Sequence, residues 1–469
     1  MINLNALFDD TDLGKPETLH ALKSLQANIL KGHGRDHVAL IFLKITDVAK
    51  ARTFVHHYPV TDAATQFVQA QAFRDTGEPG SLVRLLLVSY TGLKAFGHHA
   101  HFNENQPHHD PFFVMGMGQD SEVLDRGGLD SWQSALRHDP LHLLLLFAHD
   151  DPLSLAAVVG KALGNPGLTS AFKVLLVQEG RAYRNSANEG IEHFGYVDGR
   201  SQPLLTKTDL AKEDTEHGGV NLYNPKTNLS QVLFQDPLAP NGVGHGSYFV
   251  FRKLEQDVAG FKQAEDALQE TFTTDPDNDD LAGAMIVGRF ENGVPTTLWT
   301  APPAVAPVTN NFNYNADAQG ARCPFQGHIR KTNPRGSSPG GLDFDKAVQM
   351  ARRGITYGVR LQDPTTKELL DQPNDGVGLL FMSYQKSIKD QFHFMQKNWA
   401  NTRKFPHVKP EEAFDGIDPI IGQLAAGDNG LVKDHRWPDH SELQQVQGFV
   451  HLKGGEYFYA PSPQGVKRL

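Results

Sequence analysis

The feature that most constrains the fold is a series of short apolar runs separated by helical patterns. Each run has seven to nine residues rich in Leu, Val, Ile and Phe, with polar residues or Gly/Pro at its ends, which is typical of buried strands. In the first half the runs are VALIFLKI (38–45), LVRLLLVSY (82–90), LHLLLLFA (141–148) and FKVLLVQ (172–178). Helices are expected at about 47–70 and over Leu153–Leu163. The resulting order, β-α-β followed by β-α-β, predicts a ferredoxin-like unit.

The second half repeats this order more loosely. SYFVFRKL (247–254) leads into a helix at about 256–271, GLLFMSYQ (378–385) leads into one from Ile388 to Asn401, and GFVHLKGGEYFYAP (448–461) is expected to form a hairpin. The sequence therefore predicts an α+β protein of two ferredoxin-like halves, each an antiparallel sheet with helices packed on it. We expect the boundary within 205–245, giving domains 1–225 and 226–469. The long loop-rich stretches 91–139 and 200–245 are expected to be functional or dimer-forming.

Composition excludes several classes of protein. Hydrophobic residues make up 39% and charged residues 21% of the 469, as in a globular protein. The formal net charge of −10 argues against a nucleic-acid partner, and no apolar run is long enough to span a membrane. The first ten residues carry no basic leader, so a cytoplasmic location is expected. The single cysteine, Cys323, excludes an internal disulfide framework, a Cys-rich metal site and haem attached through Cys-x-x-Cys-His.

Two charged segments have ordinary explanations. Among the 22 histidines, five lie in GHHAHF (97–102) and QPHHDP (106–111), but their spacing matches no helical or zinc-finger metal motif. A solvated loop is therefore favoured there over a transition-metal site. The acidic run DPDNDD (275–280) has Asp280 and Ile286 where an EF-hand needs Gly and Glu, so it is interpreted as a solvated turn.

Three other segments carry residues suited to chemistry. HFGYVDGRSQP (193–203) holds Asp198 between glycines, CPFQGHIRKTNPR (323–335) places His328 just before Arg330, and MARRGITYG (350–358) ends a helical pattern with Arg352. Taken singly, each has a plain structural explanation: an Asx turn, a packed histidine and a basic helix end. A neutral histidine with several cations nearby would also suit an anionic cofactor.

Together these segments resemble the dye-decolourising peroxidases, a family of haem peroxidases. The family's Gly-x-x-Asp-Gly motif matches Gly195 to Gly199, its haem-binding stretch matches His328 to Arg335, and its Arg-x-Gly-Ile-x-Tyr-Gly stretch matches Arg352 to Gly358. Further similar stretches are LQANILKGHGRDH (25–37), GRFENGVP (288–295), QFHFMQKNWAN (391–401), FDGIDPIIGQ (414–423) and the C-terminal segment 448–461. The resemblance covers nearly the whole chain and is to the larger forms without a signal peptide.

The resemblance implies a role for four residues. His328 stands where the family has its proximal haem-iron ligand, Asp198 where it has the distal acid–base, and Arg352 where it has the distal arginine that also contacts the cofactor. Arg330 is a candidate partner for a haem propionate. The cofactor implied is non-covalent haem b, in a pocket mainly in the C-terminal half, with the Asp198 motif at the end of the N-terminal domain.

The carboxylate that supports the proximal histidine is left open at this point. The family pattern favours an acid in the helix after GLLFMSYQ, where this chain has Asp390 and His393, so either of these or another residue could take the position.

The chemistry implied is oxidation of organic substrates, such as dyes and phenols, by hydrogen peroxide. An oxo-ferryl intermediate would be reduced in one-electron steps by small aromatic or dye-like reductants, partly through surface residues among Trp132, Trp299, Trp399, Trp437 and the 11 tyrosines. Two alternatives remain open: a haem carrier or haem-processing protein on the same fold, and a non-haem binding or structural protein. Family members commonly associate, so the resemblance also allows a homo-oligomer.

Overall fold

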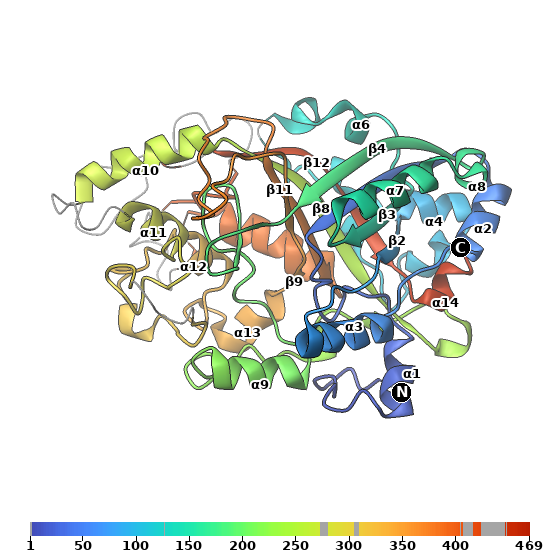
Figure 1. Ribbon diagram of the computed structural model, residues 1–469, viewed down its shortest axis with the longest axis horizontal. Helices are drawn as coiled ribbons and strands as arrows, with labels where there is room; N and C mark the ends of the chain where they lie inside the picture. The colour runs from blue at the N-terminus through green and yellow to red at the C-terminus, as the bar shows by residue number, and fades with distance from the viewer. Residues whose placement is uncertain are drawn as a thin grey trace.

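The fold is organised around one continuous antiparallel sheet. The computed structural model describes residues 2–469 except 126, 273–279, 304–308, 404, 407–415, 424–445 and 447. In these residues the strand order is β10-β11-β8-β12-β2-β3-β1-β4, with β7 and β9 pairing at its side (Figure 1). The bounds are β1 His37–Ile45, β2 Val83–Ser89, β3 Leu143–His149, β4 Phe172–Arg181, β7 Phe234–Gln235, β8 His245–Gln256, β9 Ala351–Arg352, β10 Ile355–Tyr357, β11 Gly378–Gln385 and β12 Val450–Ala460.

The sheet contains the same strand order twice. Counted along the chain within each half, β2-β3-β1-β4 and β10-β11-β8-β12 both read second, third, first, fourth, which is the ferredoxin-like arrangement. The prediction of two ferredoxin-like α+β halves is therefore confirmed. The halves meet where β12 pairs with β2, Phe458 opposite Ser89 and Tyr459 opposite Val88. In Figure 1 they lie side by side, with α10 at one end and α2 at the other. The domain boundary at residue 225 stays a prediction.

The helices of the first half differ from the sequence prediction at one place. The helix expected at 47–70 is two helices, α2 (Val48–His56) and α3 (Ala63–Thr76), separated by a segment that contains Pro59. Each helix has its own aspartate N-cap, Asp47 accepting from Lys50 N and Asp62 from Thr65 N at 2.8 Å. The expected helix at Leu153–Leu163 is α7 (Pro152–Leu163), which packs on β3 and β1.

The second half places two predicted segments differently. The helix predicted at 256–271 is α10 (Val258–Phe272), and the helix after β11 is wound as two wide π-helical segments, η7 (Ile388–His393) and η8 (Met395–Ala400). Arg352 does not end a helix: α13 (Gly341–Val348) stops earlier, and Arg352 lies on β9, opposite Ser383 of β11. The strand pairing fixes the backbone of Arg352 more firmly than a frayed helix end would.

The prediction of a hairpin at 448–461 is wrong. The segment is a single strand, β12, whose pairing with β8 shifts register between Leu452 and Gly454. Gly454 and Gly455 mark a bulge where neighbours come close, since a Cβ on them would lie 2.3 Å from Leu136 Cδ1 and Met117 Sδ respectively. The glycines thus serve packing across the strand instead of a turn.

The histidine-rich segment is only partly the solvated loop that was predicted. His108 stacks on Phe234 with ring centroids 4.6 Å apart, and His109 Nδ1 lies 2.9 Å from the carbonyl oxygen of Phe102. Asp110 is buried and caps α5 by accepting from Phe112 N. Of the acidic run, residues 275–279 lie outside the described residues, and Asp280 precedes α11.

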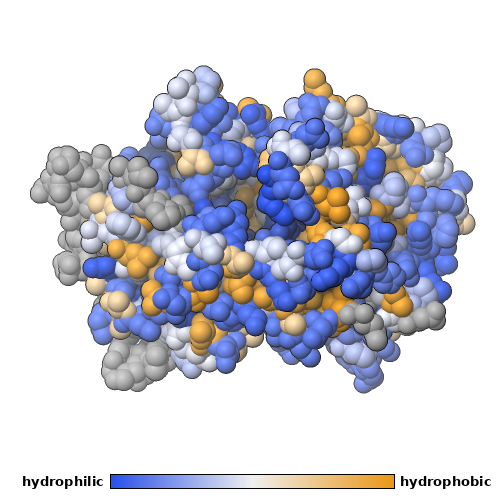
Figure 2. All heavy atoms as spheres, turned by 60° about the horizontal axis from the view of Figure 1, so that its bottom comes forward, coloured by the Kyte–Doolittle hydropathy of each residue, from blue (hydrophilic) through white to orange (hydrophobic). Residues whose placement is uncertain are grey.

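The remaining elements are short and connect this framework. They are α1 Pro16–Leu22, α4 Tyr90–Phe96, η1 His99–Phe102, α5 Pro111–Met115, η2 Met117–Gln119, η3 Gly128–Ser131, α6 Ser134–Arg137, α8 Pro166–Thr169, β5 Tyr183–Arg184, β6 Gly190–Ile191, α9 Lys207–Glu216, η4 Leu229–Gln231, η5 Pro240–Gly242, α11 Leu281–Val287, η6 Asn315–Asp317, α12 His328–Thr332 and α14 Pro463–Val466. No helix among the described residues combines the length and the apolar composition needed to cross a bilayer. Figure 2 shows one face of the molecule, largely hydrophilic, with hydrophobic side chains gathered between the polar ones.

Candidate active site

A cavity of about 200 Å³ lies against the second half of the sheet. Its walls come from β11, η7, η8, α12 and the segment before α9, so that residues far apart in the sequence face one space. The lining is largely apolar and includes Val197, Val287, Ile329, Val348, Leu379, Phe381, Phe392, Met395, Ile420 and Ile421. Its polar side chains include His328, Asp198 and Arg352. An apolar slot with a few converging polar groups is the usual form of a cofactor site.

His328 is fixed by a buried carboxylate. It begins α12, and its Nδ1 lies 2.8 Å from Oδ2 of Asp418, whose side chain is fully buried. Asp418 Oδ1 accepts from the backbone amides of Ile420 and Ile421 at 2.8 and 3.0 Å. Because a carboxylate only accepts, Nδ1 carries the hydrogen, and Nε2 is the nitrogen left for a ligand.

The charge on the imidazole of His328 depends on the same neighbours. Burial opposes a positive charge, but the charge of Asp418 and its hydrogen bond raise the pKa of His328 above its ordinary value. Arg352 lowers this pKa and Asp198 raises it, so the charges of both side chains act on the imidazole.

Asp198 and Arg352 form an ion pair on the cavity. Arg352 Nη1 donates to Asp198 Oδ1 at 3.2 Å, and Nη2 donates to the carbonyl oxygen of Arg200 at 2.7 Å. Both side chains keep about a third of their surface exposed, 35% and 33%. Among the described residues, Asp198 Oδ2 accepts no hydrogen bond, so one carboxylate oxygen is free toward the cavity.

A tight turn presents Asp198. Gly195 and Gly199 have φ of 105° and 85°, a region that favours glycine, and Asp198 N donates to the carbonyl oxygen of Gly190 at 3.0 Å. Glu192 closes the turn by accepting from Phe194 N at 2.9 Å and Tyr196 N at 3.1 Å. Burial raises the pKa of Glu192 to about 7.

Arg330 does not join this site. Its side chain is 1% exposed and donates to Asp317 Oδ2 at 3.2 Å and to the carbonyl oxygen of Cys323 at 2.7 Å. It also lies over the rings of Tyr314 and Phe325, and it does not line the cavity. Residues two apart on a helix point about 200° apart, so a helix that turns His328 toward the cavity turns Arg330 away. The contact of Arg330 with a cofactor carboxylate finds no support in this geometry and stays a prediction, whereas Arg200 and Arg289 are cations that do line the cavity.

Asp418, missed by sequence reasoning, supports His328. Asp390 instead accepts from Ser387 Oγ at 3.0 Å at the start of η7, and His393 faces Asp120 and Glu122. The expectation that the helix after β11 supplies the supporting group is thus wrong. The available signal was the stretch FDGIDPIIGQ (414–423), which contains Asp418.

The donor set suits a metal ion held within a planar organic cofactor. His328 Nε2 is a nitrogen donor, and the surrounding lining is apolar enough to hold an organic ring system. Cys323 offers no competing ligand, because its side chain is fully buried and burial raises its pKa to about 11. The cavity therefore combines one imidazole donor with a carboxylate–guanidinium ion pair.

Comparison with known proteins agrees with this arrangement. Residues 216–407 match the family model described as Dyp-type peroxidase, C-terminal. Multifunctional dye peroxidase DyP2 of Amycolatopsis sp. is 38% identical over 95% of both chains, and the dye-decolorizing peroxidase msp1 of Mycetinis scorodonius is 29% identical over 96% of this chain and 87% of its own.

Solved structures show the same similarity. That of DyP2 from Amycolatopsis sp. covers 100% of both chains with a TM-score of 0.88 and 34% identity. That of a DyP-type peroxidase from Anabaena sp. covers 99% and 98% with a TM-score of 0.85 and 33% identity. Fold, cavity and relatives together define the chain as a peroxidase, an oxidoreductase. More particularly, it belongs to the dye-decolourising peroxidase family.

Proposed function

We propose that the protein is a haem peroxidase that uses hydrogen peroxide to oxidise dyes, phenols and similar small aromatic reductants in one-electron steps. The observation that carries this proposal is the pairing, on one cavity, of His328 held by Asp418 with the Asp198–Arg352 ion pair. An imidazole donor and an acid–base pair are the groups that peroxide cleavage at a haem requires.

The residues that would hold the haem follow from the lining. His328 Nε2 would bind the haem iron, and the side chains of Leu379, Phe381, Phe392 and Met395 would provide apolar surface for the ring. The fit is non-covalent, since the single thiol, Cys323, is buried and hydrogen-bonded away from the cavity lining. When bound, the haem iron supplies one-electron redox chemistry at a site open to peroxide.

Asp198 is the proton carrier in this proposal. Its free Oδ2 takes the proton from the inner oxygen of peroxide and returns it to the outer oxygen as that oxygen leaves. Arg352, fixed on Asp198 Oδ1 and on the carbonyl oxygen of Arg200, offsets the negative charge that develops on the leaving oxygen. The two side chains therefore divide proton transfer and charge stabilisation between them.

Large reductants would need a route at the surface. Of the tryptophans predicted to serve, Trp132 and Trp399 are buried, Trp299 is 40% exposed, and Trp437 lies outside the described residues. Trp299 is therefore the surface position that we propose first for dye oxidation. A cytoplasmic location and self-association stay predictions, checked by fractionation and by size-exclusion chromatography.

The test is haem binding followed by peroxide turnover. The purified protein is expected to show a Soret band and to oxidise a dye only when peroxide is added. A Soret band without turnover would favour the haem-carrier alternative, and no band after haem addition would contradict both haem functions.

A further inference from the structure

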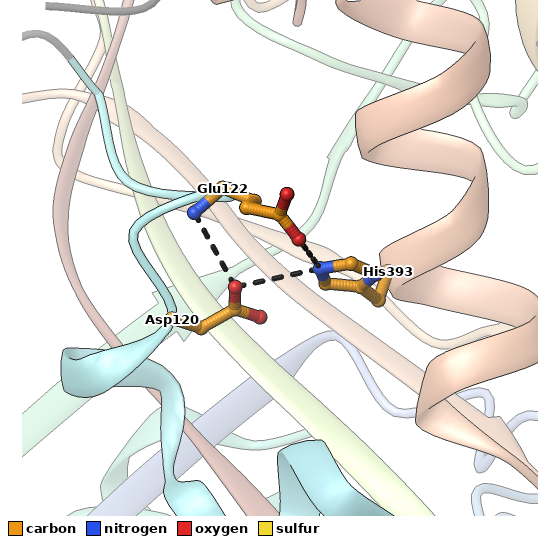
Figure 3. A group of neighbouring side chains, drawn as sticks. All are labelled: Asp120, Glu122 and His393. Carbon is orange, nitrogen blue, oxygen red and sulfur yellow. Dashed lines mark hydrogen bonds and ion pairs between the residues drawn. The ribbon is translucent and has the colours of Figure 1, made fainter.

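A second group of metal-binding side chains lies outside the active site. Asp120 and Glu122 follow η2 in the first half of the chain, and His393 is the last residue of η7 in the second half. His393 Nε2 lies 3.4 Å from Asp120 Oδ1 and 3.2 Å from Glu122 Oε2, and the three ligand atoms all lie within 4.8 Å of one another (Figure 3).

The ring of His393 is held in a fixed orientation, and its Nε2 faces the two carboxylates without making a hydrogen bond. Its side chain is only 6% exposed, and its ring stacks on Phe112 with centroids 3.6 Å apart and planes 20° apart. Nε2 is buried and has no hydrogen-bond partner. The two carboxylates lie at ion-pair distances without making hydrogen bonds to it, so a cation placed among the three groups would satisfy this buried nitrogen.

Both carboxylates are held in place by other residues. Asp120 is 1% exposed, its Oδ2 accepts from Tyr457 OH at 2.8 Å, and its Oδ1 accepts from Glu122 N at 3.4 Å while facing His393. Glu122 Oε1 pairs with Lys397, which leaves Oε2 facing His393. Such outer partners orient the ligands of metal sites, and Tyr457 and Lys397 would orient these two carboxylates in the same way.

The spacing fits a cation better than a direct ion pair. A hydrogen bond between an imidazolium and a carboxylate is typically ~2.7–2.9 Å long, shorter than either separation here. Two donors that each lie ~2.1 Å from a tetrahedral zinc ion are ~3.4 Å apart, close to the 3.2 and 3.4 Å found. The side chain of Glu122 is 43% exposed, so the position is open to solvent.

We propose that Asp120, Glu122 and His393 bind one divalent transition-metal cation such as Zn²⁺. One nitrogen and two carboxylate donors are a usual zinc ligand set, with water completing the coordination. The cation fastens the segment after η2 to η7, whose Phe392 lines the active-site cavity, and so links the two halves beside that cavity.

Zinc binding to the haem-loaded protein tests this site. We expect isothermal titration calorimetry and metal analysis after dialysis to give one zinc per chain for the unmodified protein. Glu122→Gln, at a half-exposed position, and His393→Gln should each raise the Kd for zinc at least ~10-fold, as loss of a ligand or of its support does. Zinc should also raise the Tm of the unmodified protein and not that of the variants.

Two controls separate this site from other histidines and carboxylates. Asp390→Asn removes a carboxylate from the same helix outside the group, and His101→Gln removes a ring from the histidine-rich segment; both should keep one zinc at unchanged affinity. The proposal is wrong if the unmodified protein binds no zinc, or if His101→Gln abolishes binding while His393→Gln does not. In either case the three side chains are an ion-pair cluster only.

Discussion

His328 and Arg352 both line the active-site cavity, each bonds to a carboxylate, and the two pairs are built differently. In the His328 pair, Asp418 is fully buried, lies 2.8 Å from His328 and accepts two backbone amides. In the Arg352 pair, Asp198 is 35% exposed, contacts Arg352 through one oxygen at 3.2 Å and keeps the other oxygen free. The carboxylate of Asp418 is therefore immobilised, whereas that of Asp198 is left available.

Because of this difference, the two carboxylates are suited to different roles. A carboxylate whose oxygens are all occupied can orient a ring and set its charge, but it has no oxygen left to take a proton from a substrate. A carboxylate with a free oxygen beside a guanidinium can move a proton while its own charge is compensated. Variants of the His328–Asp418 pair and of the Arg352–Asp198 pair should therefore lose different measurable properties.

The largest effect is expected from His328→Ala. Loss of the axial nitrogen should abolish retention of haem, seen as loss of the Soret band after gel filtration. His101→Gln, at an exposed histidine that does not line the cavity, is the matched control and should retain the band. An unchanged axial ligand spectrum in His328→Ala would show that another residue holds the iron.

Variants of the Asp198–Arg352 pair should react more slowly with peroxide and should still bind haem. Asp198→Asn removes the proton acceptor and is expected to slow the reaction with peroxide ~10²–10⁴-fold, while Arg352→Leu should slow it ~10²–10³-fold. Stopped-flow mixing of the haem-loaded variants with peroxide measures both. If the two single variants and the double variant react as fast as the unmodified protein, this pair does not act on peroxide.

A smaller effect is expected from Asp418→Asn. The neutral side chain keeps the size of aspartate but no longer raises the pKa of His328, so the imidazole becomes a weaker donor. We expect haem affinity to fall ~10–100-fold and the iron reduction potential to rise, measured by haem transfer to an acceptor protein and by spectroelectrochemistry. A loss of peroxide rate at unchanged potential would instead place Asp418 in the proton-transfer step.

The smallest effect concerns the turn beneath Asp198. The pKa of Glu192 is about 7 in the folded protein against an ordinary 4.5, so between these values the folded state holds a proton that the unfolded state has released. The stability contributed by this group is present below the unfolded value and is lost as pH rises through the folded value. Comparing Tm at about pH 5 and about pH 8, Glu192→Gln should lose less than the unmodified protein. Glu179→Gln, on the exposed edge of β4, should behave like the unmodified protein.

Much of the sheet and half of the site were predictable because their signals are local. The apolar run at 378–385 is β11 with the same bounds, and the runs at 38–45 and 247–254 differ from β1 and β8 by one or two residues. Asp198, His328 and Arg352 stand out because each lies in a short motif of fixed spacing.

The residues that were missed or misplaced depend on tertiary contacts. Asp418 lies 90 residues from His328 in sequence, and only folding brings the two together. The resemblance makes Arg330 a candidate partner for a haem propionate, but its side chain bonds to Asp317 in this structure. The two glycines of β12 have the pattern of a turn, and their packing against Leu136 and Met117 could not be predicted from their own segment.

The place of β12 in the sheet has a consequence for how the chain is made. The four strands of the first half are complete at residue 181, whereas the second half needs β12 (Val450–Ala460). Domains fold as units from the N-terminus during synthesis. The first half can thus assemble before the second, and the cavity, which Val450 of β12 helps to line, is completed only when that strand pairs with β8.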